Sequence, residues 1–167
     1  PPGNKPPGTM RIEVKRRLHA IDLSNRSYIQ LNGLEFRAAG IRTDARSSHL
    51  TFDGLTGTYV AHSYQRDISG QAGVLIHGSF HTVRNSTFAY SSGSVVDVRG
   101  TSSRIVNCFI HSGNYGAKWR GTLAVRGRRH LIAYNTVRHS GRDLVNIHGL
   151  TESRIYKNDL SDAGWLT

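Results

Sequence analysis

The amino-acid sequence predicts an all-β fold, a right-handed parallel β-helix (solenoid) of about six coils, from three observations. A five-residue phrase recurs at intervals of about two dozen residues, a second phrase with an asparagine falls between its copies, and no helical period separates them. The 167 residues include 18 glycines and many Ser, Thr and Asn. This composition favours many short strands joined by turns, and the chain length favours one domain.

The first phrase reads apolar, any residue, apolar, basic, glycine. Its copies close at Gly78, Gly100, Gly127 and Gly149, so the glycines are 22, 27 and 22 residues apart. Because strand side chains alternate between two faces, the apolar residues should face the core and the basic residue should face outward. Burial of the apolar side chains, worth about 1.5–3 kcal/mol for each, should dominate the free energy of folding. The expected core pairs are Val74 and Ile76, Val96 and Val98, Leu123 and Val125, and Val145 and Ile147.

The second phrase places an asparagine among apolar residues, followed by a small residue and a glycine that indicate a turn. Its four asparagines are Asn85, Asn107, Asn135 and Asn158. Stacked carboxamides can donate to one neighbouring coil and accept from the other, so we expect one structural ladder. Residues 28–33 and 49–54 match less well and are expected to form the first coils.

Over residues 27–164, these repeated phrases resemble those of the pectin-lyase-like superfamily of right-handed parallel β-helices. The phrases are specific for the architecture and identify no subfamily or activity. Known members are mostly secreted lyases and hydrolases of acidic polysaccharides, alongside epimerases, phage tailspikes and surface adhesins. The resemblance therefore implies a secreted or cell-surface protein.

The charge balance favours an anionic partner. The net charge is +11, from 22 Lys plus Arg against 11 Asp plus Glu, and such a field attracts polyanions. Arginine predominates, and its planar fork binds carboxylate, sulfate or phosphate with two hydrogen bonds. We expect an acidic polysaccharide as partner. Nucleic acid is the weaker alternative because no recognised binding module is present, and no apolar run is long enough to predict a membrane span.

The outward basic residues of the four phrases should stack along one face: His77, Arg99, Arg126 and His148. Neighbouring parallel strands lie about 4.8 Å apart, so this column could face several acidic groups of a polymer, which would relieve the repulsion within it. In the alternative interpretation, the histidines are neutral and Asp97, on the same face, pairs with a neighbouring arginine.

Two coils are longer than the others, at residues 59–71 and 114–120. Both extra segments follow the asparagine strand, so they should project from the same edge as the walls of a groove, where function often lies. The first segment offers His62, Tyr64, Arg66 and Asp67, and the second offers Tyr115, Lys118, Trp119 and Arg120. The alternative is that Trp119 anchors its loop and that the charges are merely solvated.

β-Elimination of an acidic polysaccharide requires a cation that neutralises the uronate carboxylate and a base that removes the adjacent proton. We predict Lys118, Arg120 and His148 as catalytic residues. The predicted substrate-binding residues are His77, Arg99, Tyr115, Trp119 and Arg126.

The acidic residues are scattered singly, which argues against the paired carboxyl groups of a glycoside hydrolase and against a calcium site. No metal site or cofactor is predicted. The leading hypothesis is a protein that binds an acidic extracellular polysaccharide and cleaves it by β-elimination. A non-catalytic module of a surface or filament assembly is the alternative.

The ends differ from the repeats. Residues 1–9 hold all four prolines and are predicted to form a linker, and residues 10–167 are predicted to form the β-helix domain. A solenoid needs covered ends, and no cap is evident after Gly164. We therefore expect end-to-end self-association or continuation as part of a longer helix. Cys108 is the single cysteine and is expected to be a small buried thiol.

Overall fold

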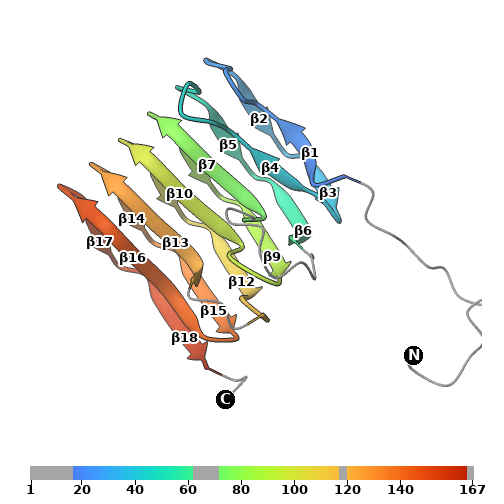
Figure 1. The fold of residues 1–167 in the computed structure, drawn as a ribbon, viewed down its shortest axis with the longest axis vertical. Coiled ribbons are helices and arrows are strands. Elements are labelled where there is room, and N and C mark those ends of the chain that lie inside the picture. Colours follow the sequence, from blue (N-terminus) through green and yellow to red (C-terminus); the bar gives the residue numbers. More distant parts are fainter. Residues whose placement is uncertain (1–16, 62–71, 117–119, 165–167) are drawn as a thin grey trace, which may run out of the picture.

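Three parallel sheets wrap the chain into a solenoid in the computed structural model, which describes residues 17–61, 72–116 and 120–164 (Figure 1). The first sheet contains β1 (His19–Asp22), β4 (Gly40–Arg42), β7 (Val74–Ser79), β10 (Val96–Thr101), β13 (Gly121–Arg128) and β16 (Asp143–Thr151). The second contains β2 (Gln30–Asn32), β5 (Thr51–Asp53), β8 (Thr82–Arg84), β11 (Arg104–Val106), β14 (Leu131–Ala133) and β17 (Arg154–Tyr156). The third contains β3 (Glu35–Arg37), β6 (Thr56–Ala61), β9 (Thr87–Ser91), β12 (Phe109–Gly113), β15 (Thr136–Ser140) and β18 (Asp159–Ala163).

Each coil contributes one strand to each sheet, and each sheet has 6 strands. The predicted all-β solenoid of about six coils is therefore confirmed, and no helix occurs in the described ranges. The predicted linker at residues 1–9 lies outside them.

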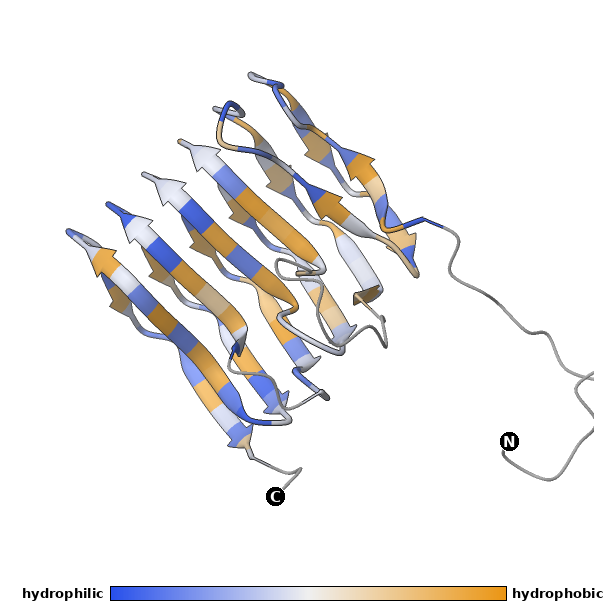
Figure 2. Ribbon diagram, in the orientation of Figure 1, coloured by the Kyte–Doolittle hydropathy of each residue, from blue (hydrophilic) through white to orange (hydrophobic). Residues whose placement is uncertain are grey.

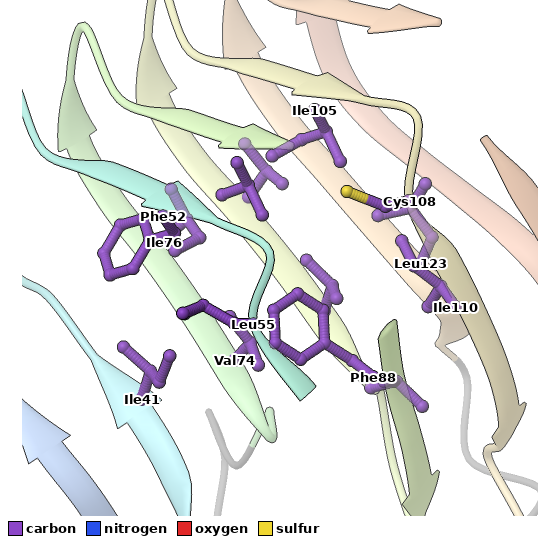
Figure 3. Close-up of a cluster of buried hydrophobic side chains, with 14 of the residues drawn as sticks. Ile41, Phe52, Leu55, Val74, Ile76, Phe88, Ile105, Cys108, Ile110 and Leu123 are labelled. Atoms are coloured by element: carbon purple, nitrogen blue, oxygen red, sulfur yellow. The ribbon is translucent and has the colours of Figure 1, made fainter. Parts of the chain in front are cut away.

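The repeated phrase sets the register of the first sheet. Val96 pairs with Val74 on one side and with Leu123 on the other, and Val98 likewise pairs with Ile76 and Val125. All six of the apolar residues in these three copies are at most 1% exposed. Apolar and polar positions alternate along the strands (Figure 2), and the apolar side chains fill the space between the sheets (Figure 3). Local alternation thus builds one shared core.

The fourth copy departs from this expectation. Val145 is only partly buried against the core, and Ile147 is 53% exposed. In the described part of the chain, β16 pairs with β13 on one side alone. The prediction that Ile147 is buried is wrong because no further coil covers it there.

Steric crowding between coils explains why glycine closes the phrase. Gly100 and Gly127 have φ values of 99° and 114°, a region that side chains disfavour. A Cβ at Gly100 would lie 2.0 Å from the carbonyl oxygen of Gly78, and one at Gly127 would lie 2.1 Å from that of Gly100. The coils therefore stack too closely at this position for any other residue.

The four asparagines form two ladders in place of the predicted single column. Asn85 and Asn107 lie in left-handed positions, with φ values of 52° and 54°. The Asn85 Nδ2 donates to Asp53 Oδ1 at 2.8 Å, and the Asn107 Nδ2 donates to Asn85 Oδ1 at 2.8 Å. This first ladder is exposed to solvent.

Asn135 and Asn158 lie one position further along their coils, because β14 aligns Ala133 with Val106. Asn135 is buried; its Oδ1 accepts from the Cys108 amide at 3.0 Å, and its Nδ2 donates to the Ile105 carbonyl at 2.9 Å. Asn158 Oδ1 accepts from the Asn135 amide at 3.0 Å. A structural role holds for all four residues, but they occupy two neighbouring columns.

Cys108 shares the buried column with Asn135. Its side chain is buried, and burial raises the pKa of the thiol to about 11. The thiol is therefore protonated at neutral pH, as expected for an inert core residue.

Candidate functional site

One buried carboxylate gathers three arginines on the outer face of the first sheet. Val96 and Val98 face the core, so Asp97 faces outward, yet it is 0% exposed. Its oxygens accept from Arg99 Nε at 3.1 Å and from Arg99 Nη2 at 2.6 Å. We call Arg99, Arg120 and Arg126, which surround Asp97, the arginine cluster.

The other two guanidinium groups approach the same oxygen. Arg120 Nη1 lies 3.9 Å from Asp97 Oδ2, and Arg126 Nη2 lies 3.8 Å from it. These are ion-pair distances rather than hydrogen bonds. Donors of both guanidinium groups therefore remain free of Asp97 and can serve a bound anion.

The repeat explains how the cluster assembles. Arg99 follows Asp97 by two residues on β10, and hence shares its face. Arg126 follows Val125, the register partner of Val98, and Arg120 directly precedes β13. The partner of Asp97 on β13 is Ala124, whose small side chain leaves room for the arginine side chains above it.

The cluster carries more positive charge than Asp97 neutralises. Its hydrogen bonds to Asp97 raise the pKa of Arg99, so this guanidinium stays protonated. Three cations against one carboxylate leave an excess of two positive charges. Among the described residues, Nε of Arg126 is buried without a hydrogen-bond partner. The three cations therefore converge on one carboxylate oxygen and form a single positive patch.

His77 borders the cluster as the register partner of Arg99 on β7. Burial lowers the pKa of its imidazole, and the neighbouring Arg99 lowers it further. Asp44 and Asp97 act in the opposite direction, and Arg126 adds a small lowering effect. His77 is therefore neutral at neutral pH.

A model of the family described as "Right handed beta helix region" matches residues 19–165. The chain belongs to the right-handed β-helix family. No curated protein and no solved structure matched in the corresponding searches. Membership establishes the architecture of this β-helix.

The structure describes only some of the remaining predicted site residues. Lys118 and Trp119 lie outside the described residues, as do His62, Tyr64, Arg66 and Asp67. His148 is exposed on β16, within the register shift between the Val125–Ile147 and Gly127–Leu150 pairs. His148 is therefore displaced from the line that joins His77, Arg99 and Arg126.

Tyr115 and Arg120 belong to opposite ends of the second long loop. Burial raises the pKa of Tyr115, which shares a hydrogen bond with the Ser112 side chain and lies near Tyr90 and Tyr59 of the third sheet. Arg120 instead joins Asp97 on the first sheet. The structure thus brings Arg120 into the arginine cluster and leaves Tyr115 near the third sheet.

The two long loops do leave the β-helix at the same edge, as expected. They connect β6 with β7 and β12 with β13, and the short β9–β10 turn lies between them. The amides of Asn114 and Gly116 donate to Gly93 O at 2.8 Å and to Ser92 O at 2.9 Å. Asn114 Nδ2 also donates to the carbonyl of Arg120. These bonds tie both ends of the second loop to the scaffold.

Sequence reasoning missed the buried residues that support the site. His81 and His130 follow His77 and Arg126 by four residues, and each Nε2 lies 3.2 Å from the carbonyl oxygen of that basic residue. The sequence contains a signal for these residues. In both copies, a basic residue and a glycine are followed by a histidine three positions after the glycine. Among the described residues, no group of three His, Cys, Asp or Glu could hold a metal, and no helix could span a membrane.

Proposed function

We propose that this β-helix is a secreted or cell-surface protein that binds an acidic polysaccharide, with the arginine cluster holding an acidic group of the polymer. The observation that carries the proposal is the convergence of three arginines on the buried carboxylate of Asp97. β-Elimination is the cleavage reaction that we propose for such a site, because the same cations would neutralise the uronate carboxylate.

Electrostatics favours a bound anion at this position. Two like charges about 4 Å apart repel by about 4 kcal/mol at an effective dielectric constant of about 20. Asp97 offsets part of this repulsion and orders the arginine side chains before ligand arrives, which lowers the entropic cost of binding. A carboxylate or sulfate group would offset the remaining charge and accept paired hydrogen bonds from the guanidinium groups.

Ion pairs elsewhere on the β-helix favour the arginine cluster as the binding site. Four arginines there lie close to acidic side chains, so their charge is locally balanced. The pairs are Arg84 with Asp53, Arg128 and Arg129 with Glu152, and Arg138 with Asp159. A nucleic-acid surface would instead need many phosphate contacts spread along the duplex, whereas the arginine cluster is compact.

Arg126→Ala tests this proposal. The variant should fold, because Asp97 keeps its hydrogen bonds to Arg99. We expect about 10- to 100-fold weaker binding to polygalacturonate or alginate, since a charge-assisted hydrogen bond contributes about 1.5–3 kcal/mol. Retention on immobilised polymer in a salt gradient measures the change.

Arg138→Ala is the matched control, because Arg138 lies on the third sheet and pairs with Asp159. Its retention should equal that of the wild type. Equal retention of the Arg126→Ala variant would contradict the proposal. Stronger retention on DNA than on both uronate polymers, with a steep salt dependence, would favour nucleic acid instead.

A further inference from the structure

We infer that His77 is the base of this site and removes the proton from carbon 5 of a uronate whose carboxylate lies on the arginine cluster. This inference rests on the proposed function. It assigns the proton transfer to a residue that the sequence suggested only as a binding residue, in place of Lys118 or His148.

Two buried side chains hold the main chain of His77. Thr43 Oγ1 accepts from the His77 amide at 2.6 Å and donates to the His77 carbonyl at 2.7 Å. His81 Nδ1 accepts from the Leu50 amide at 3.2 Å, so its Nε2 carries the proton and donates to the same His77 carbonyl at 3.2 Å. Thr43 is 1% exposed and His81 is 0% exposed. The main chain that carries the His77 side chain is therefore fixed from inside the solenoid.

The imidazole of His77 is available for chemistry. It is half-buried on the outer face, and no hydrogen bond to its ring occurs within the ranges that the structure describes. Charged groups from three elements face the imidazole: Asp44 from the segment after β4, Asp97 and Arg99 from β10, and Arg126 from β13. His81 lies on the same coil as His77. Burial and the adjacent Arg99 lower its pKa, so the ring can accept a proton at neutral pH.

The alternatives on the same face fit the role less well. Arg99 stays protonated because its hydrogen bonds to Asp97 raise its pKa. His148 is exposed on β16, within the register shift of the β13–β16 pairing. His77 alone among these three residues combines a neutral ring with a position in register with the cluster.

The reaction balances without a co-reactant. The arginine cluster neutralises the carboxylate and thereby acidifies the hydrogen on carbon 5. An imidazole nitrogen of His77 takes this proton, and the electrons of the C–H bond form the double bond between carbons 4 and 5. The bond from carbon 4 to the glycosidic oxygen breaks, and that oxygen takes the proton from the imidazolium. The reaction leaves His77 neutral. It produces one chain with an unsaturated uronate end and one chain with a new saccharide end.

His77→Gln tests the inference on the full chain with polygalacturonate, alginate and chondroitin sulfate as probes. Ultraviolet absorbance of the unsaturated product follows cleavage, and retention on immobilised polymer follows binding. We expect retention of the variant within about twofold of the wild type and a loss of kcat of about 10²–10⁴-fold, the usual contribution of a positioned base. For the wild type, kcat/KM should rise with pH through an apparent pKa below the ordinary histidine value of 6.5.

His139→Gln is the matched control, because this exposed histidine lies on the third sheet beside Asp162. It should cleave like the wild type. Retention of the wild type without any unsaturated product, or cleavage by the His77→Gln variant within threefold of the wild type, would overturn the role of His77 and leave the proposed binding function intact. Failure of the wild type to bind any of the three polymers would overturn the proposed function itself.

Discussion

Buried polar residues shape this solenoid at the scale of single side chains. Asp97, His81 and His130 are at most 2% exposed, and each has hydrogen-bond partners. A buried polar group without partners costs about 1–3 kcal/mol, so these contacts hold the neighbouring main chain in one arrangement. Asp97 organises the arginine cluster, while the two histidines fix the carbonyls of His77 and Arg126.

His81 should make the stability of the protein pH-dependent. Burial lowers its pKa from 6.5 to about 4, and protonation of Nδ1 would break the hydrogen bond that this atom accepts from the Leu50 amide. The unfolded chain therefore binds more protons than the folded chain between these two pH values, and the free energy of unfolding falls as pH falls. The contribution is fully present above pH 6.5 and is lost as pH falls toward 4, by on the order of 3 kcal/mol.

Urea unfolding at several pH values between 4 and 7 measures this effect. His81→Ser is the informative variant, since Ser103 and Ser153 hold the equivalent position in other coils, where they precede β11 and β17. The variant should show a weaker pH dependence over that range. An unchanged slope would mean that other groups, such as His130, whose pKa is also lowered by burial, govern the transition.

At the scale of the strands and turns, the two asparagine ladders differ in burial and hence in energetic weight. Asn135 lies inside the coil and satisfies the Cys108 amide and the Ile105 carbonyl. Asn107 lies at the exposed position, where it donates to Asn85. Water can replace the contacts of Asn107 but has no access to those of Asn135.

Asn135→Ala should therefore destabilise the fold by about 3 kcal/mol, because it leaves buried backbone groups unsatisfied. Asn107→Ala, the matched control one coil earlier, should cost less than about 1 kcal/mol, and chemical denaturation compares the two. Equal losses of unfolding free energy would show that burial does not separate the ladders.

At the scale of the whole molecule, the coil of β16, β17 and β18 lies at one end of the stack (Figure 1). Ile147 is 53% exposed and Leu160 is 48% exposed on this coil. Unpaired strand edges beside apolar side chains are templates for further strands. Within residues 17–61, 72–116 and 120–164, no strand pairs with the outer edges of β1, β2 and β3. A second copy that docks these edges here would continue all three sheets in the same direction, as a non-catalytic filament module would require.

We therefore expect concentration-dependent association through this end, measured by sedimentation velocity. Replacing Ile147 and Leu160 together by lysine should weaken it, because charge at a strand edge opposes pairing. Phe80→Lys is the control, since Phe80 is also exposed but lies on a turn at the side of the solenoid. A wild-type protein that stays monomeric at all concentrations would contradict this expectation.

The sequence alone determined the architecture and the direction of the repeated side chains. Alternation along a strand is local, so Val96 and Val98 could be assigned to the core and Arg99 to the outer face without coordinates. The repeat likewise identified the coils and the shared edge of the two long loops. The roles of Lys118 and Trp119 stay predictions.

Which groups meet across coils depends on how the coils stack. The asparagine phrases looked equivalent, yet the pairing of Ala133 with Val106 displaces Asn135 by one position from Asn107. The convergence of Arg120 and Arg126 on Asp97 depends on the small Ala124 and on how the second loop returns to β13. Such contacts join residues more than 20 positions apart, and their register is a property of stacked coils that no single repeat contains.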